Sequence, residues 1–210
     1  MFLRKPFKYS YFHASLILIL INLVFFITIR FSNMHISILS LNTYNVIRAH
    51  CYWQFITYMF THYSFSHFFF NMLALAMFGV GVERAIGSKE FLLMYFVCGI
   101  LSGALSFCVY LLLPNNGMNV FLMGASGAIY GILFAYAVCY PRSILSIWGI
   151  IPVPAPILVL IYAIIAIVDE IFVANGVSNI THLFGFAVAW LYFLIRMGVR
   201  PLKIWINSYK

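Results

Sequence analysis

The chain has 210 residues, of which 65% are hydrophobic and 19% aromatic, while only 8% are charged. This composition excludes a water-soluble globular domain, in which about a quarter of the residues are charged, and indicates a polytopic membrane protein. The net charge of +8 follows the pattern of membrane topology, so we expect the lipid bilayer as a partner and no nucleic acid.

Six apolar segments are candidates for transmembrane helices, each of which needs about 20 residues. They are expected at residues 12–29, 66–82, 91–113, 125–140, 155–173 and 181–195. The fourth segment is short and rich in small residues, so we expect it at the centre of the bundle, surrounded by protein. The predicted fold is therefore an all-α membrane protein, with one domain over residues 1–210.

Basic residues gather on one side of these spans. Only Arg30 and Arg48 fall on the opposite side. The ten on the first side are Arg4, Lys5, Lys8, Arg84, Lys89, Arg142, Arg196, Arg200, Lys203 and Lys210. The positive-inside rule then predicts that both termini are cytoplasmic.

The long external segment between the first two spans, residues 31–65, is not a polar linker. It combines apolar patches with aromatic residues such as Tyr52, Trp53 and Tyr58. Because Trp and Tyr favour the headgroup level of a bilayer, we expect this loop to lie in the membrane interface.

Span two begins with a group of polar residues. Ser64 or Ser66 can cap its first turn. His67 and Asn71 are four residues apart and share one helix face, which must look onto a cavity or a neighbouring helix rather than lipid. That pattern fits either a structural hydrogen bond to a neighbouring helix or a functional site in a cavity. His62 precedes them, but no nearby Cys or carboxylate completes a metal site, so we expect none.

Charged residues mark the ends of two spans. Glu83 and Arg84 end span two, where we expect a structural role in pairing or in binding the exposed backbone of the turn at Gly87–Ser88. Asp169 and Glu170 end span five and are expected to be solvated at the external interface.

Loops and turns are expected between the spans. The three prolines within residues 143–156 indicate an interfacial loop rather than a helix interior. External turns are predicted at residues 114–117 and 175–179.

The stretch from Gly124 to Gly131 is the most informative part of the chain. Gly124 permits an unusual backbone just before a helix, which places Ser126 at the helix N-terminus. Tyr130 follows one turn later on the same face. Gly127 and Gly131 begin a stripe of small residues for close helix packing. Alone, the stretch fits a packing helix as well as an active site.

Span six begins with His182, followed by Gly185 and Ala189 on nearly the same face. Small residues there would let span six approach span four closely. A lone His at a helix start is usually a cap or a packing residue. Beside a stripe that can meet Ser126, however, His182 is a candidate base.

These polar residues suit serine-protease chemistry if they converge. His182 could take the proton of Ser126 and return it to the leaving amine. The Ser126 backbone N–H, the Asn71 amide and the His67 ring are candidate donors to the oxyanion, and Tyr130 could orient the His182 ring. A two-aspartate mechanism is excluded because Asp169 is the only Asp, and the metalloprotease pattern HExxH is absent. No cofactor is expected.

In these motifs the chain resembles the rhomboid family of intramembrane serine proteases. The family's Gly-x-Ser-Gly core is matched by Gly124–Gly127, with Tyr130 four residues after the serine. Its His-x-x-x-Asn is matched by His67 and Asn71, and its His-x-x-Gly by His182 and Gly185. The Glu-Arg and Gly-Ser pairs after span two and the six-span topology also agree.

The resemblance implies a six-helix rhomboid-like bundle and a serine endopeptidase. Its catalytic dyad would be Ser126 and His182, with His67, Asn71 and the Ser126 backbone supporting the oxyanion and with Tyr130, Gly124, Gly127 and Gly185 as supporting residues. It implies transmembrane protein substrates, cut near the external ends of their helices at small residues, with span five and residues 174–180 governing substrate access. We expect a multi-pass protein of a bacterial plasma membrane.

Two positions depart from the family pattern. The common Trp-Arg of the first loop reads Trp53-Gln54, and a common glycine of span six is Ala189.

Two other functions fit the sequence less well. A catalytically silent rhomboid-like protein that binds membrane clients typically lacks the serine or histidine that this chain keeps. A transporter is disfavoured by the lack of inverted repeats and of intramembrane charges for coupling.

Overall fold

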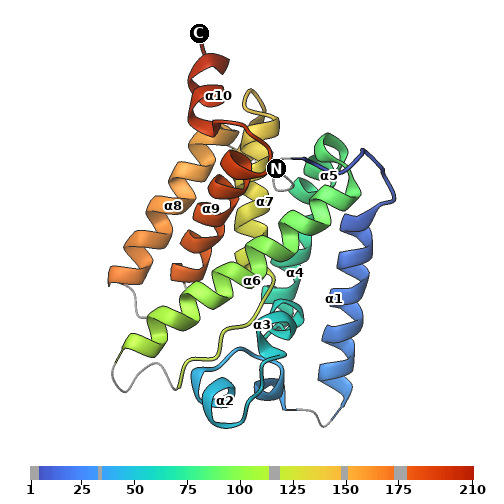
Figure 1. The fold of residues 1–210 in the computed structure, drawn as a ribbon, viewed down its shortest axis with the longest axis vertical. Coiled ribbons are helices and arrows are strands. Elements are labelled where there is room, and N and C mark those ends of the chain that lie inside the picture. The colour runs from blue at the N-terminus through green and yellow to red at the C-terminus, as the bar shows by residue number, and fades with distance from the viewer. Residues whose placement is uncertain (1–4, 33–34, 114–118, 148–150, 173–178) are drawn as a thin grey trace.

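The computed structural model describes residues 5–32, 35–113, 119–147, 151–172 and 179–210 (Figure 1). The turns predicted at residues 114–117 and 175–179 lie outside this part of the chain, apart from Asn179. So do residues 174–178 of the segment expected to govern substrate access, and Arg4.

The described chain is mostly helical, which confirms the predicted fold class. Four helical segments are long and apolar enough to cross a membrane: α1 (Ala14–Phe31), the continuous segment Phe65–Ile86, α6 (Ser88–Leu112) and α8 (Ala155–Phe172). Two shorter apolar helices, α7 (Ser126–Cys139) and α9 (Asn179–Ile195), complete a set compatible with the six predicted spans.

The short helix α7 occupies the centre of the bundle. It contacts α6, α8 and α9 and the helical segment 65–86, and most of its side chains are buried (Figure 1). Fourteen residues give a helix of about 21 Å, whereas the hydrocarbon core of a bilayer is roughly 30 Å thick. Because α7 cannot reach both surfaces, residues 119–125 enter the bundle to meet its first residue, Ser126 (Figure 1).

The segment Phe65–Ile86 is one helix with a local widening. It consists of α4 (Phe65–Ala74), a π-helical stretch labelled η4 (Leu75–Gly79) and α5 (Val80–Ile86). Ser64 caps it, since its Oγ accepts a hydrogen bond from the N–H of His67 at 3.2 Å. π-Bulges of this kind often occur next to functional sites.

The first loop is ordered by short helices and buried hydrogen bonds. These helices are η2 (Ile36–Ile38), α2 (Thr43–Arg48), α3 (Gln54–Thr57) and η3 (Tyr58–Phe60). The fully buried Gln54 donates to the carbonyl oxygens of Ser37 and Ile38 and accepts from the N–H of Asn42. Gln54 therefore anchors the loop at the position where the family commonly has arginine.

Glu83 binds backbone groups other than those that we predicted. Its buried carboxylate accepts hydrogen bonds from the N–H groups of Ala14 and Ser15, at 2.6 and 2.9 Å, and from the hydroxyl of Ser88. The expected structural role is thus present, but Glu83 contacts the turn through the Ser88 hydroxyl and not through its backbone. The backbone groups that it binds are two free N–H groups at the start of α1.

The structure contains two elements that were not predicted. Residues expected to form an interfacial loop contain an antiparallel hairpin of β1 (Ile144–Ile147) and β2 (Ile151–Pro154). A two-stranded sheet consists only of edge strands, where proline is tolerated, so the prolines did not exclude it. The amphipathic helix α10 (Pro201–Ser208) follows α9, and Trp205 ties it to α7 by donating to the Ala137 carbonyl at 3.0 Å.

Glu170 is exposed, which agrees with the expected solvated position, and it also has a protein partner. Its Oε2 accepts a hydrogen bond from the N–H of Ile180 at 3.0 Å. The end of α8 therefore caps the first turn of α9, which carries His182.

Candidate active site

The first residue of α7 meets the first turn of α9. Nε2 of His182 lies 2.9 Å from Oγ of Ser126, within hydrogen-bonding distance, and both residues are partly buried. The two residues are 56 positions apart in sequence, so their contact depends on the packing of the two helices.

Gly124 fixes the approach of the chain to Ser126. Its φ of +110° lies in a region that L side chains rarely adopt, and an added Cβ would come within 2.6 Å of Nε2 of His67. Its N–H donates to the carbonyl of Tyr58 at 2.9 Å, and Leu122 exchanges two backbone hydrogen bonds with Leu41. The first loop thus holds the segment that precedes Ser126.

Glycines set the distance between α7 and α9. A Cβ on Gly185 would lie 2.3 Å from the carbonyl oxygen of Gly127, and one on Gly131 would lie 3.3 Å from the carbonyl oxygen of Gly185. Ala189, one turn after Gly185 in α9, is fully buried. The close approach expected from the small-residue stripes is present, and Ala189 is compatible with it.

The ring of Tyr130 stacks on His182. Their centroids are 4.1 Å apart and the planes differ by 9°. Nδ1 of His182 is buried and has no hydrogen-bond partner among the described residues. The imidazole is therefore oriented by Ser126 and by stacking, with no carboxylate bonded to it in the part of the chain that the structure describes.

Ser126 and His182 open into a cavity of about 1210 Å³ that His67 and Asn71 also line. The structure thus brings together the four residues singled out from the sequence. The Asn71 amide donates to the carbonyl of His67 at 2.7 Å, so one of its two N–H groups is used within its own helix. The other remains to serve a group in the cavity.

His62 also lies in this region, and from the sequence we considered it only as a possible metal ligand. It is 3% exposed, its ring centroid lies 5.1 Å from that of His67, and neither ring nitrogen has a hydrogen-bond partner among the described residues. Burial, reinforced by His67, lowers the pKa of His62 to about 3. The only sequence signal was its place five residues before His67.

This arrangement can perform acyl transfer to a serine. A serine hydroxyl becomes nucleophilic when an adjacent base accepts its proton, and an imidazole within about 3 Å can do so. Ser126 begins α7 and no side chain caps that helix. The first N–H groups of α7 lack intrahelical partners and are therefore suited to a developing oxyanion.

Comparison with known proteins gives a family match. Residues 49–198 match the family model described as the Rhomboid domain. Rhomboid protease AarA from Providencia stuartii is 27% identical over 220 residues, covering 92% of this chain and 77% of that protein. Rhomboid protease GluP from Bacillus subtilis (strain 168) is 40% identical over 84 residues, covering 40% of this chain and 15% of that protein.

A plant protein also matches. RHOMBOID-like protein 4 from Arabidopsis thaliana is 29% identical over 168 residues, covering 80% of this chain and 40% of that protein. The chain spans less than half the length of this relative.

Proposed function

The chain belongs to the rhomboid family of membrane proteins, and from that premise we propose that it is an intramembrane serine endopeptidase with Ser126 as nucleophile and His182 as general base. The observation that carries the proposal is the 2.9 Å contact between Nε2 of His182 and Oγ of Ser126. At family level, similarity to two bacterial rhomboid proteases supports a protease.

In the proposed first step, Nε2 of neutral His182 accepts the proton of the Ser126 hydroxyl. Oγ forms a bond to the carbonyl carbon of the substrate peptide. The Ser126 N–H, the His67 ring and the free N–H of the Asn71 amide stabilise the resulting oxyanion. His182 then donates its proton to the departing amine as the C–N bond breaks, which leaves an ester on Ser126.

In the second step, water attacks the ester carbon while His182 accepts one of its protons. Return of that proton to Oγ releases the carboxylic acid and restores the enzyme. Stacking on Tyr130 keeps the ring in one orientation through both steps.

We propose transmembrane segments as substrates because the walls of the cavity are largely apolar. Phe70, Met77, Leu133, Leu158 and Tyr162 line it together with the polar residues. A transmembrane helix would have to unwind locally to offer a peptide carbonyl to Ser126. A cut near the helix end at small residues fits this requirement, because small side chains impose little steric hindrance.

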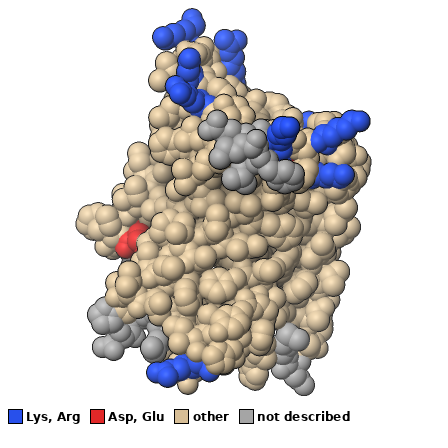
Figure 2. Space-filling view, in the orientation of Figure 1, with Lys and Arg blue, Asp and Glu red and all other residues tan. Residues whose placement is uncertain are grey.

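We place both termini on the cytoplasmic side. Figure 2 shows many of the visible Lys and Arg side chains at the end of the molecule that carries α10 and the N-terminal segment, above a broad surface with few charges. The positive-inside rule assigns that end to the cytoplasm. The relatives come from bacteria and from a plant, so a bacterial plasma membrane stays a prediction from the sequence.

The direct test is cleavage of a tagged transmembrane substrate by purified full-length protein in detergent. Ser126→Ala and His182→Ala are each expected to abolish cleavage, while His35→Ala, at an exposed loop histidine, retains it. Cleavage that persists in either dyad variant would refute the assignment. Absence of cleavage by the folded wild-type protein across a panel of substrates would favour the catalytically silent alternative.

A further inference from the structure

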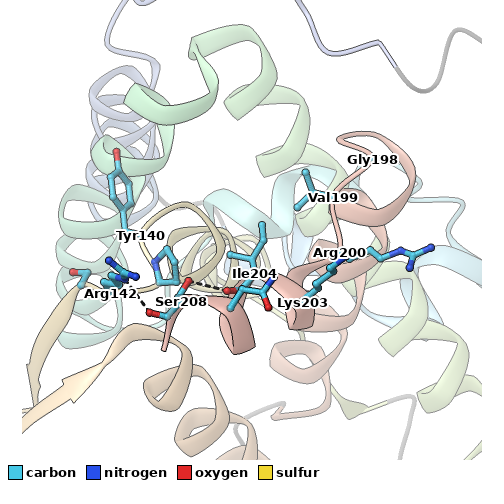
Figure 3. A pocket seen from close by; sticks show the side chains of 11 residues that line it. Tyr140, Arg142, Gly198, Val199, Arg200, Lys203, Ile204 and Ser208 are labelled. Atoms are coloured by element: carbon cyan, nitrogen blue, oxygen red, sulfur yellow. Dashed lines mark hydrogen bonds between the residues drawn. The ribbon is translucent and has the colours of Figure 1, made fainter. Parts of the chain in front are cut away.

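A second cavity, of about 880 Å³, lies outside the candidate active site (Figure 3). The turn after α7, residues 140–143, forms one wall, and the segment 198–208 that includes α10 forms the other. It shares no lining residue with the cavity around Ser126. A ligand bound in this second cavity would therefore not occupy the candidate active site.

Hydrogen bonds hold the two walls of this cavity together. Nε of Arg142 donates to the carbonyl of Ser208 at 2.9 Å, and the Tyr209 hydroxyl donates to the carbonyl of Pro141 at 2.6 Å. Trp205 anchors α10 to α7 between them. The cavity is thus a built feature of the fold rather than a gap beside a loose C-terminal segment.

The cavity carries positive charge that no carboxylate balances. Arg142, Arg200 and Lys203 line it, and no acidic residue lines its described part. Of the four acidic side chains in the chain, Glu83 and Glu90 are buried among other partners, while Asp169 and Glu170 end α8. In Figure 3, Arg142 and Arg200 lie on opposite sides of Ile204, so the charge extends along the cavity.

The position of the cavity fits the boundary between lipid and water. Its two walls directly follow the ends of the membrane helices α7 and α9, at Cys139 and Ile195. On α10, Leu202 and Ile206 are 52% and 60% exposed and lie one turn apart, as in a helix that rests in the membrane interface. Val199 and Ile204 give the cavity an apolar surface beside its cations.

We propose that this cavity binds the headgroup of an anionic phospholipid from the leaflet on the side of the termini. The cations would hold the phosphate, and the apolar wall would contact the glycerol and the first part of the acyl chains. Basic pockets at this level of membrane proteins suit such headgroups. A small inorganic anion would contact the cationic side chains but not the apolar wall.

The test uses the purified full-length protein in a neutral detergent, with native mass spectrometry to count retained lipid. Phosphatidylglycerol is expected to be retained in preference to phosphatidylcholine at equal concentration. Lys203→Gln and Arg200→Gln remove side chains that make no hydrogen bond or ion pair to described residues, so the fold should persist. Each is expected to weaken phosphatidylglycerol retention about fivefold.

Arg30→Gln and Arg48→Gln, at the opposite end of the molecule, are the matched controls and should leave retention unchanged. Equal retention of the two lipids, or unchanged retention in both Lys203→Gln and Arg200→Gln, would overturn the proposal. Inorganic phosphate is added in a separate arm. Displacement of the lipid by millimolar phosphate would assign the site to a free anion and would also overturn the lipid proposal.

Discussion

The contact between Ser126 and His182 depends on two glycines that leave no room for a side chain. The carbonyl oxygen of Gly127 occupies the space that a side chain at Gly185 would need, and the His67 ring occupies the corresponding space at Gly124. These glycines therefore act on the site through the position of backbone, although neither can carry a proton.

Gly185→Ala tests this spacing. The new methyl group would fall 2.3 Å from the Gly127 carbonyl oxygen, so α9 must move away from α7. We expect cleavage to fall about 100-fold, since a displacement of roughly 1 Å can have that effect, and stability to fall by about 1–3 kcal/mol. Rates measured beside Ala187→Val, which adds volume on an exposed part of α9, provide the comparison. A wild-type rate in Gly185→Ala would contradict the role of this contact.

Tyr130 should act through its ring and not its hydroxyl. Stacking on His182 is retained in Tyr130→Phe, for which we expect kcat near that of the wild type. Tyr130→Leu removes the stacking and is expected to lower kcat about tenfold with little change in KM, because orientation of the base is lost rather than substrate binding. Equal kinetics in the Phe and Leu variants would argue against a positioning role.

His62 should make stability depend on pH. Its pKa is lowered to about 3 in the folded state from an ordinary value of 6.5, so the unfolded chain binds the proton more tightly. Stability is therefore fully present above pH 6.5 and is lost as pH falls toward 3, by up to about 4 kcal/mol. Unfolding followed against pH should show this loss in the wild type and a smaller one in His62→Phe. Identical curves would disprove the burial of a neutral imidazole.

Whole elements of the chain were predicted to different degrees. Apolar length was sufficient to locate the four helical segments that are long enough to cross a membrane and the two shorter apolar helices α7 and α9. The spacing of His67 and Asn71 placed both on one cavity face. The strands β1 and β2 and the helix α10 are too short for periodicity to identify them, and the prolines pointed toward an irregular loop. The contact of Glu170 with Ile180 joins the ends of two helices, which no local pattern reveals.

Gln54 shows how the first loop, although irregular, is held in one conformation. Gln54→Ala would remove three hydrogen bonds from a fully buried side chain and leave loop backbone groups without partners. We expect a loss of about 2–4 kcal/mol, measured by thermal or denaturant unfolding in detergent. Ile56→Ala, in the same short helix at a 48% exposed position, should change stability much less. Similar losses in both variants would mean that Gln54 does not anchor the loop.

At the scale of the molecule, the helix α7 is too short to span the bilayer, and its first residue is therefore inside the bundle. The first loop fixes the chain before Ser126, α9 brings His182 alongside, and the widened helix 65–86 contributes His67 and Asn71. Motif spacing in the sequence was enough to suggest that these four side chains converge, and they line one cavity. It also predicted the unusual backbone at Gly124. It could not predict the backbone hydrogen bonds from Tyr58 and Leu41 to the segment before Ser126, because these join distant parts of the chain.

The most direct measurement is the site of reaction with a fluorophosphonate probe, which forms a covalent bond with an activated serine. The full-length protein is labelled and the modified peptide identified by mass spectrometry. We expect the label on Ser126, with labelling reduced about 100-fold or more in His182→Ala because the base is gone. A label on another serine, or undiminished labelling of Ser126 in His182→Ala, would contradict the dyad.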